Sequence, residues 1–135
     1  MRQIVLHYLV VLVVFLAIDA AWLSTAGRMI YSAEIGQLLR DSPNFAVAFV
    51  FYMIFALGLL VFVVEPALTS SHLWRNIMLG GFFGLVAYAT YDMTNLATMK
   101  GFTTRIAIID MAWGSFLSAS VTGLSVWLIK AFKLI

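Results

Sequence analysis

Four long stretches of the sequence contain no Asp, Glu, Lys or Arg, and they limit what the chain can fold into. They cover residues 3–18, 42–64, 76–91 and 111–129 of a chain of 135 residues. A helix needs about 20 mostly apolar residues to cross a bilayer. With 64% hydrophobic and 10% charged residues, a water-soluble domain of this size could not bury its apolar surface. The sequence therefore predicts an all-α integral membrane protein, a four-helix bundle that forms one domain over residues 1–135.

The predicted membrane-spanning helices cover residues 4–23, 44–64, 77–99 and 106–129. The second is expected to end before Pro66, because proline cannot continue a helix. The third and fourth are joined by so few residues that they must be antiparallel neighbours. Residues 26–41 are predicted to form an amphipathic helix, which lies either in the lipid headgroup region or against the bundle. One side of that helix carries Tyr31, Ile35, Leu38 and Leu39.

Three aspartates interrupt the apolar helices near one predicted membrane face. Asp19 lies near the end of the first span, Asp92 near the end of the third and Asp110 near the start of the fourth. At roughly 1.5 Å of rise per residue, the three carboxylates lie on the order of 6 to 10 Å inside their helix ends. Helical phasing points them into the protein. We expect one polar pocket, lined by Asp19, Asp92, Asn95, Asp110, Tyr88, Tyr91, Trp22 and Trp113.

Ionisable side chains inside a membrane are costly, by roughly 2.5 to 3.5 kcal/mol at its centre, and they commonly mark functional sites. The pocket is therefore a candidate to bind a lipid headgroup, a polar or cationic small molecule, or a proton. The structural alternative is a clamp in which Lys100 and Arg105, on the same side of the membrane, neutralise the acids.

Small residues recur on the third and fourth spans at helical spacing. They are Gly80, Gly81 and Gly84 on the third, and Gly114, Ser118 and Thr122 on the fourth. Such patterns let helix backbones approach closely in lipid. A second recurrence is the motif IDAAW at residues 18–22, repeated as IDMAW at residues 109–113. This short echo is weak evidence of duplication.

Several classes of protein lack support in the sequence. There is no cysteine, and His7 and His72 stand alone, so neither a disulfide nor a metal site is expected. No cofactor is expected either, and no phosphate-binding loop or nucleophile motif is present. An enzyme acting on lipids through paired acids is therefore the least favoured function. A net charge of +2, scattered along the chain, does not indicate a nucleic-acid partner.

The stretches FLAIDAAWL, VVEPAL, GLVAYATYDMTNLATMKGF and DMAWGSFL resemble a family of small bacterial integral membrane proteins catalogued as a domain of unknown function. The resemblance covers nearly the whole chain and implies a four-helix protein of the bacterial inner membrane. It implies no activity, so no site residue follows from it. Expected partners are membrane lipids and either a second copy or other membrane subunits. The alternative function is that of an accessory subunit in a larger membrane complex.

The N-terminal segment is interpreted as a retained helix rather than a cleaved signal peptide, because an aspartate stands where small neutral residues should precede cleavage. Basic residues are equally divided between the two predicted membrane sides. The free N-terminal amine and two lysines near the C-terminus favour cytoplasmic termini.

Overall fold

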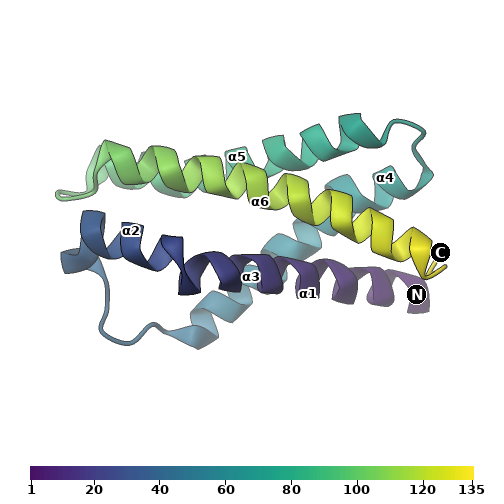
Figure 1. Cartoon of the computed structure of the whole chain (residues 1–135), viewed down its shortest axis with the longest axis horizontal. Coiled ribbons are helices and arrows are strands. Elements are labelled where there is room, and N and C mark those ends of the chain that lie inside the picture. The colour runs from purple at the N-terminus through teal and green to yellow at the C-terminus, as the bar shows by residue number, and fades with distance from the viewer.

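A computed structural model describes all 135 residues, most of which are helical. Helix α1 spans Arg2–Ser24, and α2 spans Ala26–Ile35 before a short 3-10 turn, Gly36–Leu38. Helix α3, Phe45–Leu59, continues through a π-helical turn, Leu60–Val64, into α4, Glu65–Thr69. Helices α5, Leu73–Thr98, and α6, Thr104–Ala131, complete the chain. Both termini lie at one end of the molecule, whereas α2 and the α5–α6 turn lie at the other (Figure 1).

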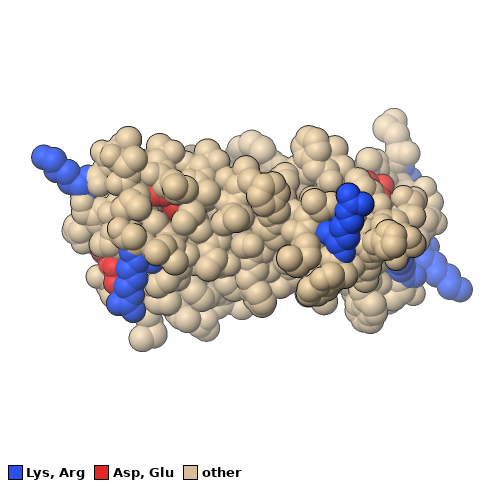
Figure 2. Space-filling model, turned by 90° about the horizontal axis from the view of Figure 1, so that it is seen from above, with Lys and Arg blue, Asp and Glu red and all other residues tan.

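Three helical stretches are long and apolar enough to cross a membrane: α1, the continuous helix Phe45–Thr69, and α6. The prediction of an all-α membrane bundle is confirmed, with three such helices rather than the four expected. Helix α5 has 26 residues, but its glycines and polar side chains make it less apolar. Its role as a fourth span remains a prediction. On the face shown in Figure 2, charged residues gather toward the two ends and leave an uncharged band between them, as a membrane-spanning bundle requires.

Pro66 does not end the helix that begins at Phe45, contrary to expectation. The helix widens at Leu60–Val64, where hydrogen bonds of the π type replace the usual α pattern. Pro66 then occupies the first turn of α4, where the absence of a backbone N–H is tolerated. The helix therefore extends to Thr69, and only residues 70–72 connect it to α5.

The apolar core lies between α1, α3 and α6. Phe15 of α1 is fully buried, and its ring stacks on Phe55 of α3 with centroids 4.9 Å apart. Leu117 and Val121 of α6 are also fully buried and close the cluster from the third side. The remaining large members come in equal numbers from the end of α3 with the π turn and from α1 with α6: Leu59, Leu60, Val63, Val64, Val11, Leu12, Val126 and Ile129. This core places the inward faces of α1 and α6 opposite each other.

Helix α5 packs along α6 through glycines, as expected for antiparallel neighbours. A Cβ atom added at Gly84 would lie 2.2 Å from the carbonyl oxygen of Gly114, a distance that real Cβ atoms do not adopt. A Cβ at Gly80 would lie 2.2 Å from the hydroxyl oxygen of Thr122. Gly114 itself lies against the ring of Tyr88. The two backbones therefore approach as closely as glycine permits, which in lipid maximises van der Waals contact.

A polar contact joins the helices at the end that holds the termini. His7 Nδ1 lies 2.5 Å from Glu65 Oε1, and His7 Nε2 donates a hydrogen bond of 2.9 Å to the carbonyl oxygen of Leu134. A single buried imidazole thereby connects α1, α4 and the C-terminal tail.

We expect Gly84→Ala to lower the free energy of unfolding by about 1 to 3 kcal/mol, because its methyl group would meet backbone that cannot move aside. Gly81→Ala is the matched control. Its Cβ would lie 3.4 Å from the Ser115 hydroxyl, so the mutant should be as stable as the wild type or slightly more stable. Unfolding in mixed micelles of mild detergent and dodecyl sulfate measures the stability of both mutants. Equal stability of the two mutants would contradict this packing.

Candidate functional site

Asp19 is buried between three helices and accepts two hydrogen bonds. The Tyr52 hydroxyl of α3 donates to its Oδ2 at 2.6 Å, and the Trp113 indole Nε1 of α6 donates to its Oδ1 at 3.0 Å. Its side chain is 5% exposed. Both donors are neutral groups that stabilise a carboxylate without a counter-charge. Asp19 therefore ties α1 to α3 and to α6.

Asp110 of α6 accepts a hydrogen bond from a side chain of α2. The Tyr31 hydroxyl donates to Asp110 Oδ1, and the Trp22 indole Nε1 of α1 donates to the Tyr31 oxygen at 3.1 Å. Tyr31 thus acts as a donor and an acceptor at once, and it joins three helices in one chain of hydrogen bonds. Burial raises the pKa of Tyr31 above its ordinary value, and the charge of Asp110 raises that pKa further. The phenol therefore stays protonated and remains a donor.

The repeated motifs, IDAAW and IDMAW, meet each other in the fold. Asp19 of the first motif is bonded to Trp113 of the second, while Trp22 of the first reaches Asp110 of the second through Tyr31. The indole rings of Trp22 and Trp113 stack with centroids 4.4 Å apart and planes inclined by 11°. Because α1 and α6 run in opposite directions, the two motifs satisfy each other reciprocally (Figure 1).

Asp92 of α5 differs from the other two acids because nothing is bonded to it. Its exposed fraction is 0%, and neither of its carboxylate oxygens has a hydrogen-bond partner. Asp110 is the neighbouring acid across the α5–α6 interface. The salt bridges of the chain join His7 to Glu65 and Arg105 to Glu34, so no basic side chain neutralises Asp92.

These contacts define an acid–aromatic cluster. It consists of Asp19, Asp92, Asp110, Trp22, Trp113, Tyr31 and Tyr52. The three aspartates are 5%, 0% and 8% exposed, so the predicted layer of acids is buried at the end of the bundle that α2 covers. Five helices contribute to the cluster, two more than the three that the sequence indicated.

The remaining predicted residues lie around the cluster without bonding to its acids. Tyr88 packs on Gly114 and meets the Phe55 ring edge to face, at 6.1 Å between centroids. Tyr91 is 57% exposed, and Asn95 is half-buried one turn further along α5. Of the proposed counter-charges, Arg105 instead lies 3.4 Å from Glu34, and Lys100 is exposed without an ion pair.

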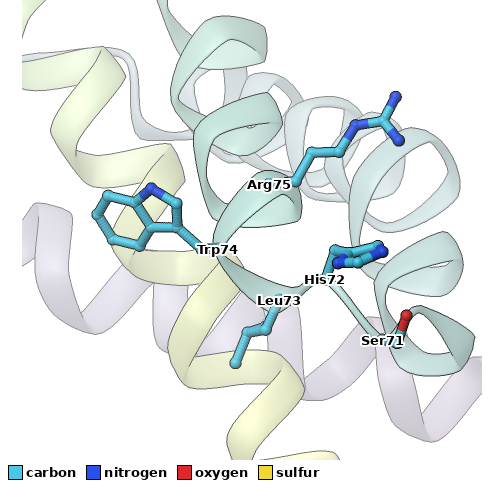
Figure 3. A pocket seen from close by; sticks show the side chains of 5 residues that line it. All are labelled: Ser71, His72, Leu73, Trp74 and Arg75. Carbon is cyan, nitrogen blue, oxygen red and sulfur yellow. The ribbon is translucent and has the colours of Figure 1, made fainter.

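Two surface hollows lie away from the cluster. One is formed by residues 71–75 at the start of α5, where Trp74 extends to the opposite side from Arg75 (Figure 3). The other is an apolar groove on the outer side of α5 and α6, lined by Ile77, Phe116, Ala119, Ser120, Gly123 and Leu124. No three His, Cys, Asp or Glu side chains are arranged to hold a metal ion.

Two residues of the cluster were missing from the predicted site. Tyr52 lies on α3, which has no acid, and Tyr31 lies on the amphipathic segment, where its ring was assigned to an apolar face. The depth of Tyr52 does not reveal its partner, because that partner depends on how α3 crosses α1. For Tyr31 a signal was available, because its segment emerges at the same membrane face as the three acids.

The fold and the cluster describe a small helical membrane protein with acids buried among aromatic side chains. The chain belongs to the family described as predicted membrane protein (DUF2177), whose profile matches residues 4–127. Comparisons with curated proteins and with solved structures found no match.

Trp113→Phe removes one of the two donors to Asp19 and should lower the free energy of unfolding by about 1.5 to 3 kcal/mol. Trp127→Phe is the control, since this tryptophan of the same helix is 62% exposed and makes no hydrogen bond. It should change stability by no more than about 0.5 kcal/mol. Detergent-titrated unfolding, followed by helical circular dichroism, compares the two. Equal losses of stability in the two mutants would show that the hydrogen bond to Asp19 does not contribute to the free energy of unfolding.

Proposed function

We propose that this protein binds a proton inside the membrane, at the carboxyl pair formed by Asp92 and Asp110. The observation that supports the proposal is the complete burial of Asp92 without a hydrogen-bond partner. Of the ligands that the sequence left open, a proton is the one that the packed surroundings of this carboxyl group admit.

An ionised Asp92 would be unfavourable for two reasons. A buried carboxylate without partners loses its hydration and receives nothing in exchange. Its neighbour Asp110 carries a carboxyl group of its own, and two adjacent carboxylates cannot both remain charged at little cost. One proton bound to the pair removes both penalties.

The surroundings favour a proton over a larger cation. The faces of Trp22 and Trp113 that meet at 4.4 Å cover each other, so they leave no room between them for an organic cation. Both oxygens of Asp19 already accept hydrogen bonds from neutral donors. Asp19 therefore serves in this proposal as the fixed negative charge of the cluster, and the Asp92–Asp110 pair as the exchangeable site.

The proposal places the protein in the inner membrane of a bacterium, with α5 as the fourth span and both termini in the cytoplasm. In this proposal the helices are surrounded by membrane lipids. The packing of α5 along α6 supports the fourth span, because the glycine face of α5 is covered by protein.

Infrared spectroscopy of the protein in lipid bilayers tests the proposal. The carbonyl stretch of a protonated carboxyl group should be present at neutral pH and disappear as the pH is raised and the proton is lost. Asp92→Asn should abolish this band while the mutant still folds, because asparagine is a neutral side chain of the same shape. Asp41→Asn, in the exposed α2–α3 connection, should leave the band unchanged. A band that survived in Asp92→Asn would place the proton elsewhere.

The second candidate function, an accessory subunit of a membrane complex, is favoured by one observation. In the groove on the outer side of α5 and α6, the exposed Phe116 and Leu124 border a hollow over Gly123 that could receive side chains of a neighbouring helix. Native mass spectrometry of the protein released from its own membrane distinguishes the candidates. A complex with other polypeptides would support the subunit, and a monomer or homo-oligomer would remove it.

A further inference from the structure

Helix α2 covers the end of the bundle where the acids lie, and it contributes one side chain to them. Tyr31 is half-buried, whereas Asp110 is 8% exposed and Asp92 is fully enclosed. The hydrogen-bonded path that leads from α2 to the carboxyl pair ends at Asp110. The only hydroxyl that α2 bonds to an aspartate is that of Tyr31.

We infer that Tyr31 is the residue through which the Asp92–Asp110 pair exchanges its proton with water, and that α2 controls this exchange. The inference rests on the proposed proton site. In the exchange, the Tyr31 O–H bond breaks as its hydrogen passes to Asp110 Oδ1, and a proton from water bonds to the Tyr31 oxygen. The phenol begins and ends neutral, and the net result is one proton moved from water to the carboxyl pair.

The side chains that face Tyr31 favour transfer of a proton through its neutral hydroxyl over formation of a charged phenolate. Asp110 of α6 accepts its hydrogen, and the Trp22 indole of α1 donates to its oxygen. Asp19 of α1 and Tyr88 of α5 act on it from further away. None of these groups is basic, so the Trp22 hydrogen bond alone favours a phenolate, and burial and the charge of Asp110 oppose it more strongly. A concerted transfer, without a charged tyrosine, is therefore the route that the surroundings permit.

Helix α2 is held over the cluster by a separate set of contacts. Glu34 accepts a hydrogen bond of 2.7 Å from the Thr103 hydroxyl and lies 3.4 Å from Arg105, both at the start of α6. Ile35 is buried against Phe102 and Ile106 in a small apolar cluster. The residues after Leu38 are exposed as far as α3. Loss of the Glu34 contacts would therefore loosen α2 without touching any aspartate.

The first α2 turn is fitted closely to the cluster as well. A Cβ atom added at Gly27 would lie 2.6 Å from the Nε1 atom of Trp22, so this turn lies directly against the indole that bonds to Tyr31. The Tyr31 hydroxyl is thus positioned from both ends of α2.

The test measures how fast the buried carboxyl group exchanges its proton for deuterium after the bilayer-embedded protein is transferred to heavy water. The shift of the infrared carboxyl band reports the exchange. Tyr31→Phe keeps the aromatic cover but removes the relay, so exchange should slow on the order of 100-fold. Tyr8→Phe removes a tyrosine hydroxyl of α1 that donates to the Met53 carbonyl oxygen and to none of the acids, so this mutant should exchange at the wild-type rate.

The possible outcomes are distinct. Unchanged or faster exchange in Tyr31→Phe would overturn the relay and leave Tyr31 as a cover. If Tyr31→Phe does not fold, Glu34→Ala tests whether α2 controls the exchange. Because this mutation loosens α2, exchange should become faster. An unchanged rate would overturn the control by α2. Failure of the proton site itself would appear earlier, as the absence of an Asp92-dependent band in the wild type.

Discussion

The contact between α5 and α6 through Gly80, Gly84 and Gly114 is the constraint on which the rest of the structure depends. Helices in lipid gain little from hydrophobic burial, so close backbone packing and polar bonds must hold them together. The same contact fixes the rotation of α5 and directs Asp92 inward, toward Asp110. Had a larger residue separated the two backbones, Asp92 would have room to turn toward the membrane surface and its water. The consequence of this tight interface is a fully buried acid without a hydrogen-bond partner.

Hydrogen bonds of ionisable side chains are concentrated at the two ends of the bundle, and the middle contains only uncharged residues, including the buried Ser118 and Thr122. At one end, hydrogen bonds to Asp19 and Asp110 connect α1, α2, α3 and α6. At the other end, His7 connects α1 to Glu65 and to the C-terminal tail. Between them the core of Phe15, Leu59, Leu117 and Val121 is free of charge. The ends can therefore set the register of the helices, while the middle matches the hydrocarbon of a bilayer.

The parts that could be predicted from the sequence are those that depend on one helix at a time. Charge-free length identified the long helices, and helical phasing placed Asp92 and the glycines of the same span on a face directed toward the protein. The parts that could not be predicted depend on how elements dock. Tyr52 reaches Asp19 only because α3 crosses α1 at that level, and Tyr31 reaches Asp110 only because α2 packs against the start of α6.

Three further differences each have an identifiable physical cause. The π turn before Pro66 lets the helix continue where proline would otherwise end it, and no residue pattern announces such a turn. The bond between His7 and Leu134 joins the two extremes of the chain, so its partner is invisible until the fold is known. For Arg105, the sequence suggested a counter-charge to the three aspartates, but its acidic partner is Glu34 on α2.

The reciprocal arrangement of the two short motifs has a consequence for how such a protein can change over generations. The aspartate of each motif is connected to the tryptophan of the other, directly between Asp19 and Trp113 and by way of Tyr31 between Asp110 and Trp22. A replacement in one segment would strand a buried group in the other, and recovery would require a second replacement far away in the chain. Residues 18–22 and 109–113 should therefore vary together among relatives, as though they were a single inherited unit.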